Sequence, residues 1–84
     1  MVQAFVLVQT EVGRATTVAR QIESVDGVVS AEAVVGPYDV IVRADGASDT
    51  EIADIVSRIQ KVDAITRTLT CPVAPQSTSA VGTA

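Results

Sequence analysis

Histidine and tryptophan are absent from this sequence of 84 residues, which has one cysteine, one tyrosine and one phenylalanine. Without histidine, the chain can form neither a Cys/His zinc cluster nor a nucleophile–histidine pair. Cys71 is the only cysteine, so no intrachain disulfide can form, and we interpret it as a small packing residue. These absences argue against catalysis and against a bound metal or cofactor.

Basic residues are also few, because six Lys and Arg stand against ten Asp and Glu for a net charge of −4. Affinity for nucleic acids comes mainly from Lys and Arg, so the composition argues against direct nucleic-acid binding. No apolar run approaches the ~20 residues of a transmembrane helix, and no charged leader precedes an apolar segment. We therefore expect a soluble, cytoplasmic protein without a membrane partner.

Aliphatic residues dominate what remains, since 48% of the residues are hydrophobic and only 2% are aromatic. A chain this short buries only about 60% of its unfolded surface, and such domains are marginally stable alone. With disulfides and zinc clusters excluded, self-association is the expected additional stabiliser.

The spacing of apolar residues predicts four strands and two helices. Strands are predicted from β-branched runs at residues 2–10, 28–35, 38–44 and 65–71. Helices are predicted from apolar stripes between residues 14 and 25 and between residues 49 and 59. Gly27 suits a left-handed helix end, and Ser48 with Glu51 forms a capping box. We predict one domain at residues 1–73 and a flexible, uncharged tail at residues 74–84.

The element order β-α-β-β-α-β predicts an α+β, ferredoxin-like sandwich. A short internal repeat supports it, since Ile22-Glu-Ser-Val25-Asp26 returns as Ile59-Gln-Lys-Val62-Asp63. In this fold both helices cover one face of the sheet, yet the predicted strands are apolar on both faces. An uncovered apolar face several strands wide exceeds what soluble monomers tolerate. We therefore expect two sheets paired face to face in a dimer, a dimeric α+β barrel.

Two stretches are candidates for a binding site. The turn Gly36-Pro37-Tyr38-Asp39 joins the two middle strands, and a carboxylate beside free turn amides could accept the ammonium of a small zwitterion. A plain hairpin connector is the alternative for Gly36 and Pro37. The threonines alternate along the last strand and would place their hydroxyls on one face, with Ile65, Arg67 and Leu69 on the other; simple strand propensity is the alternative. The threonines are Thr66, Thr68 and Thr70.

Several motifs together resemble the ligand-binding (RAM) domain of Lrp/AsnC-type transcriptional regulators. They are Phe5-Val-Leu-Val-Gln-Thr10, Gly13, Val25-Asp-Gly-Val28, Val35-Gly-Pro-Tyr-Asp-Val40 and Thr66-Arg-Thr-Leu-Thr70. The resemblance implies a ferredoxin-like fold, face-to-face dimers, and rings commonly of eight subunits. It also implies that a free amino acid binds between dimers, with Gly36, Tyr38, Asp39, Thr66, Thr68 and Thr70 as ligand-binding residues.

Regulators of that family carry a helix-turn-helix domain ahead of this module, whereas this sequence begins at the first strand. The resemblance therefore implies a stand-alone amino-acid-binding and oligomerisation module that does not itself read DNA. It makes full-length regulators of the family candidate partners. A purely structural module without ligand and a small dimeric α+β barrel enzyme are the alternatives.

Overall fold

Residues 2–73 are described by a computed structural model, and the predicted tail at residues 74–84 lies outside them. The elements are β1 (Val2–Thr10), α1 (Ala15–Glu23), β2 (Val28–Ala33), β3 (Val40–Gly46), α2 (Asp49–Ile59) and β4 (Ile65–Pro72). This β-α-β-β-α-β order confirms the predicted ferredoxin-like α+β fold. Within the described part of the chain, neither helix has the length and apolar character needed to span a bilayer.

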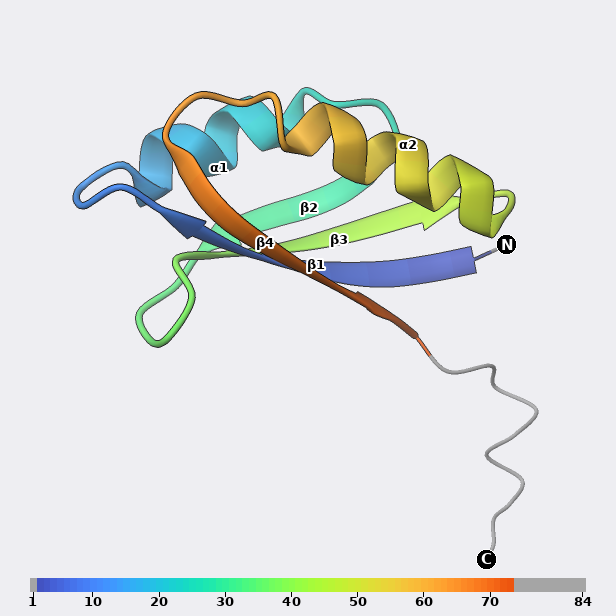
Figure 1. The fold of residues 1–84 in the computed structure, drawn as a ribbon, viewed down its shortest axis with the longest axis horizontal. Helices are drawn as coiled ribbons and strands as arrows, with labels where there is room; N and C mark the ends of the chain where they lie inside the picture. The colour runs from blue at the N-terminus through green and yellow to red at the C-terminus, as the bar shows by residue number, and fades with distance from the viewer. Residues whose placement is uncertain (1, 74–84) are drawn as a thin grey trace, which may run out of the picture.

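The four strands form one antiparallel sheet in the order β2-β3-β1-β4. Both helices cover the same face of this sheet, and the other face carries no helix (Figure 1). The first strand of the chain therefore lies inside the sheet, between β3 and β4. In its register, Val6 is opposite Val42 on one side and Thr70 on the other.

The core lies between the sheet and the two helices. Strand residues of one parity are buried beneath the helices, as the alternation of side chains along a strand requires. The helices contribute Ile22 from α1 and Ile55 with Ile59 from α2, each almost or fully buried. The strands contribute Ala4, Val6, Val8, Ala31, Val40, Val42 and Ala44.

The predicted cap at the start of α2 is present, whereas α1 ends earlier than predicted, at Glu23 with Ser24 as its C-cap, so Gly27 does not cap it. Gly27, just before β2, has a φ of 95°, which is the left-handed region that favours glycine. Ser48 Oγ accepts a hydrogen bond of 3.3 Å from the Glu51 N–H, and Glu51 Oε1 accepts one of 3.0 Å from the Ala47 N–H. The start of α2 is therefore fixed by a variant of the capping box, in which Glu51 bonds the residue before the N-cap instead of Ser48 itself.

The bounds of β2 and β3 differ from the prediction: β2 is shorter, and β3 begins and ends two residues later. Strand β2 ends at Ala33 rather than at residue 35, and β3 begins at Val40 rather than at residue 38. The reason is a loop closed by backbone hydrogen bonds from the Val34 N–H to the Asp39 oxygen (2.8 Å) and from the Asp39 N–H to the Val8 oxygen (2.9 Å). Residues 36–39, which were predicted to form a tight turn, are therefore part of a longer β2–β3 loop at residues 34–39.

The predicted face of Ile65 in β4 is wrong, because the register between β1 and β4 shifts between Gln9 and Thr10. Arg67 is opposite Gln9 and Ile65 is opposite Thr10, so Thr66 is an extra residue in β4. The irregularity turns Ile65 toward the core, where it is partly buried. Ile65 therefore does not share a face with Arg67 and Leu69 as the alternation predicted.

The sheet face away from the helices is apolar at its centre, as the two-sided strand pattern predicted. Ile41, Leu7 and Leu69 lie side by side across three strands, and Phe5 lies beside Cys71 in the neighbouring row. Phe5, Ile41 and Leu69 are 39%, 37% and 47% exposed, large values for apolar residues of a sheet. We call this surface the uncovered sheet face.

Candidate ligand-binding site

Thr68 and Thr70 lie on the helix side of the edge strand β4. They are opposite Val8 and Val6, whose side chains are buried beneath the helices. Thr68 Oγ1 accepts a hydrogen bond of 2.9 Å from Gln60 Nε2, at the end of α2. Thr68 and Thr70 therefore face α2, and Thr68 is hydrogen-bonded to Gln60, the residue that follows the last residue of α2.

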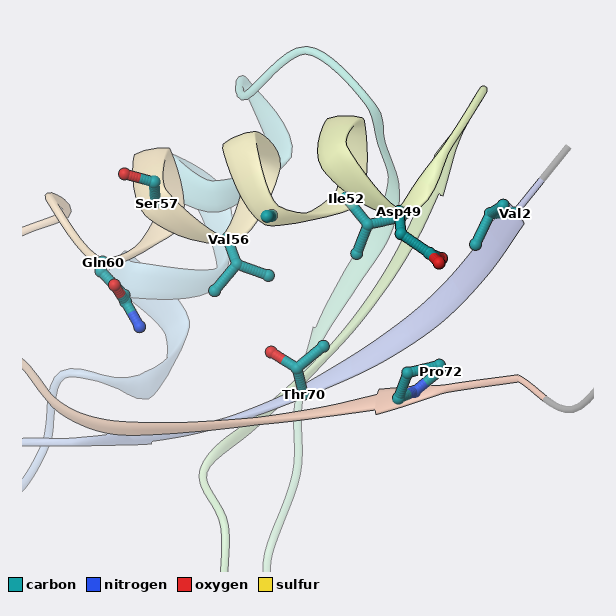
Figure 2. A pocket seen from close by; sticks show the side chains of 9 residues that line it. Val2, Asp49, Ile52, Val56, Ser57, Gln60, Thr70 and Pro72 are labelled. Atoms are coloured by element: carbon teal, nitrogen blue, oxygen red, sulfur yellow. The ribbon is translucent and has the colours of Figure 1, made fainter.

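An open groove of about 500 Å³ runs between α2 and the strands β1 and β4. Ile52 and Val56 extend from α2 toward Thr70 and Pro72 on the opposite wall (Figure 2). The volume lies within the ~300–1,000 Å³ typical of small-molecule sites. We call it the α2–β4 groove; its lining residues are Val2, Asp49, Ile52, Ala53, Val56, Ser57, Gln60, Thr70 and Pro72.

A smaller hollow of about 220 Å³ lies beside the first residues of β4. Its walls are Gln60, Ile65, Thr66, Arg67 and Thr68, and Arg67 is the only charged residue among them. Gln60 lines both this hollow and the α2–β4 groove. Since Thr68 and Thr70 are two residues apart on one strand, roughly 7 Å, the two spaces follow one another along β4. We call this smaller space the threonine hollow.

Gly36, Tyr38 and Asp39 lie in the β2–β3 loop, which extends away from the helices (Figure 1). Asp39 Oδ2 accepts a hydrogen bond of 2.8 Å from the Thr10 N–H. The Pro37 oxygen accepts one of 2.9 Å from Gln9 Nε2. Both bonds fasten the loop to the end of β1, so Asp39 has a structural role that the sequence did not reveal.

Neither the α2–β4 groove nor the threonine hollow is lined by residues of both predicted sets. Thr70 lines the groove, Thr66 and Thr68 line the hollow, and no residue of the β2–β3 loop lines either of them. Sequence reasoning also missed Gln60 and the contribution of α2 to the groove. In the sequence, Ile52 and Val56 follow the spacing of an ordinary buried helix stripe, which gives no sign that one edge of that stripe borders a groove.

A ferredoxin-like sheet with a ligand-sized groove beside its edge strand and an uncovered apolar face defines a small binding domain. The chain belongs to the Lrp/AsnC ligand binding domain family, whose model matches residues 3–78. The family predicted from the sequence motifs is therefore confirmed. No curated protein matches the sequence.

Solved structures agree with this fold. TTHA0845 from Thermus thermophilus has a TM-score of 0.83 at 26% identity, over 89% of this chain and 95% of that one. E. coli AsnC has a TM-score of 0.79 at 22% identity, over 89% of this chain and 52% of that one. The transcriptional regulator NMB0573 from Neisseria meningitidis, solved as an L-Met complex, has a TM-score of 0.75 at 18% identity, over 89% and 51%. The chain thus spans about half the length of these two regulators.

Proposed function

We propose that the chain is an amino-acid-binding and oligomerisation module in which the effector binds between copies. The family is a ligand-binding domain, and one structural neighbour was solved with L-Met bound. Effector binding would act by favouring one assembly state over another. Full-length regulators of the family, which would offer the same surfaces, are candidate partners for mixed assemblies.

The observation that carries the proposal is the separation of the candidate site residues within one chain. The β2–β3 loop extends away from the helices (Figure 1), with Asp39 bonded to β1 at its base, whereas Thr68 and Thr70 face α2. A site that uses both sets therefore needs the loop of one copy beside the β4 strand of another. Such a site forms only in the assembly, which links ligand binding to oligomerisation.

The uncovered sheet face supplies the first level of that assembly. Its apolar centre, Phe5, Leu7, Ile41 and Leu69, is flanked by Arg43 and by Glu32. Burying ~500 Å² of apolar surface on each partner contributes on the order of 10 kcal/mol before the cost of association. Two copies would pair their sheets face to face as a dimeric α+β barrel, and dimers would then join through loops and edge strands into larger rings.

The effector chemistry follows from the loop. Asp39 Oδ2 is bonded to the Thr10 N–H, and the carboxylate keeps a second oxygen, Oδ1, that can accept from an ammonium. Backbone N–H groups in the loop around Gly36 and Tyr38 can donate to the effector carboxylate. A free α-amino acid presents both groups on one carbon and fits this pairing.

Calorimetry with the common free amino acids tests the proposal. We expect at least one of them to bind and to raise the sedimentation coefficient. Asp39→Asn keeps an oxygen for the Thr10 N–H but removes the charge, so we expect a loss of affinity of about 10- to 100-fold, as for a hydrogen bond to a charged group. Asp54→Asn, on the exposed side of α2, is the matched control and should bind as the unchanged protein does.

If no amino acid binds at millimolar concentration, the ligand-binding proposal fails and the interaction module without ligand replaces it. If Asp39→Asn binds as tightly as Asp54→Asn, the loop is a structural connector and the effector site lies elsewhere.

A further inference from the structure

We propose that Glu32 and Arg67 select the partner of this chain, because each forms an ion pair with the other residue of a second copy when two sheets pair face to face. This rests on the proposed function and goes beyond it by assigning the residues that decide which chain is accepted and in which orientation. Both residues lie on the uncovered sheet face, on its two edge strands β2 and β4.

One row of side chains crosses the whole uncovered sheet face. From β2 to β4 the row is Glu32, Ile41, Leu7 and Leu69, since each residue is the register partner of the next. Arg67 lies two residues from Leu69 on β4 and therefore on the same face. The face thus has an acid at its β2 edge, an apolar centre and a cation at its β4 edge.

Within one chain these two charges are far apart. Glu32 and Arg67 are separated by three strand spacings, roughly 14 Å, because β3 and β1 lie between the strands that carry them. An ion pair inside the chain would need both side chains to lie fully extended across Ile41 and Leu7. Both residues are exposed. A dimer that covers this face takes part of both charges out of water, which is unfavourable unless each meets an opposite charge.

Two-fold symmetry supplies those opposite charges when opposite edges meet. Every contact in a two-fold dimer occurs twice, with the residues exchanged between the copies. If β2 of each copy lies over β4 of the other, the centre of the row falls between Ile41 and Leu7, and Ile41 lies over the partner's Leu7. Glu32 then reaches Arg67 of the partner subunit, once on each side of the apolar centre.

The other way to pair the faces brings like edges together. Each strand then crosses its own counterpart, and Glu32 faces Glu32 of the partner subunit. Like charges placed opposite each other reject a wrong partner or a wrong orientation. The charge pattern therefore favours a second copy with opposite edges in contact.

Arg43 is the other cation near Glu32, but it lies on the inner strand β3, beside Phe5. When opposite edges meet, Arg43 lies over the partner's Phe5, and a guanidinium stacks favourably on an aromatic ring. This arrangement leaves Arg67 as the cation for Glu32.

Exchange of the two charges tests the inference on the full chain. In Glu32→Arg and in Arg67→Glu every edge contact joins like charges, so we expect self-association to weaken roughly a hundredfold in sedimentation equilibrium. In an equimolar mixture of the two variants, both edge contacts again join opposite charges. We expect native mass spectrometry of this mixture to show the mixed dimer, and the double variant Glu32→Arg/Arg67→Glu to recover the homodimer.

Glu23→Arg and Arg20→Glu are the matched controls. They make the same charge changes at exposed residues of α1, which lies on the opposite side of the sheet from the uncovered face. Each should dimerise as the unchanged protein does, and their mixture should show no preference for the mixed dimer.

Single variants that dimerise as the controls do, or a mixture without the mixed dimer, overturn the inference. A mixed dimer of Glu32→Arg with Arg43→Glu, but not with Arg67→Glu, overturns the assignment of Arg67. In both cases a dimeric unchanged protein that binds an amino acid leaves the proposed function standing. A monomeric unchanged protein overturns both.

Discussion

Gly27 combines a left-handed backbone with close contact to another element. Its φ is 95°, and a Cβ at this position would collide with Cδ1 of Ile55 and lie 2.8 Å from Cγ1 of that residue. A left-handed non-glycine residue adds ~1–2 kcal/mol, and overpacking a core adds ~1–3 kcal/mol. We expect Gly27→Ala to lower the free energy of unfolding by about 2–5 kcal/mol in urea denaturation.

Gly13 is the matched control, because it has a similar φ of 80° but a Cβ added there would meet nothing within 4 Å. Gly13→Ala should therefore lose only the backbone part, about 1–2 kcal/mol. Equal losses in the two variants would show that α2 yields to the new methyl group.

At the scale of the element, the start of α2 depends on one hydroxyl. Ser48 Oγ accepts from the Glu51 N–H, one of the backbone donors that a helix leaves unpaired in its first turn. We expect Ser48→Ala to lower the free energy of unfolding by about 1 kcal/mol. Ser48→Asp keeps an accepting oxygen and should retain most of the stability in the same denaturation experiment. If the two variants lost the same amount, the cap would not contribute.

Elements whose signals are local in sequence were predictable. The capping residues Ser48 and Glu51 are three positions apart, and Gly27 directly precedes the first residue of β2. The strands, too, follow from local signals, because runs of β-branched residues favour extended backbone. The family motifs implied the ferredoxin-like fold, and the structure gives the order of the strands in the sheet.

What the sequence did not reveal depends on segments distant in the chain. The extra residue Thr66 exists only because β4 shifts its register against β1 at Thr10. The short ends of β2 and β3 reflect the bonds of Asp39 to Val8 and Thr10. The α2–β4 groove likewise arises from how far a helix lies from an edge strand. None of these contacts leaves a pattern within a single stretch of sequence.

At the scale of the whole molecule, the uncovered sheet face should determine the oligomeric state. Ile41 lies at its centre, beside Leu7, and is 37% exposed. In a face-to-face dimer, Ile41→Lys would bury an ammonium without a partner, which is strongly unfavourable. We expect this variant to sediment as a folded monomer at micromolar concentration, where the unchanged protein sediments as a dimer or larger.

Val35→Lys is the control, since Val35 lies in the β2–β3 loop and is fully exposed. We expect Val35→Lys to leave the pairing of two sheets into a dimer unchanged. The assembly of dimers into larger rings is a separate step, and this control does not test it. A dimeric Ile41→Lys variant, or a monomeric unchanged protein, would contradict pairing through this face.

The position of β1 inside the sheet has a consequence for how the chain folds. Strand β1 pairs with β3 and β4, and its Phe5 lies opposite Cys71, near the other end of the described residues. Contacts between residues so far apart in sequence slow folding, because a long loop must close before they stabilise anything. We therefore expect the pairing of β1 with β4 to form later in folding than the pairing of β2 with β3, which only a short loop separates.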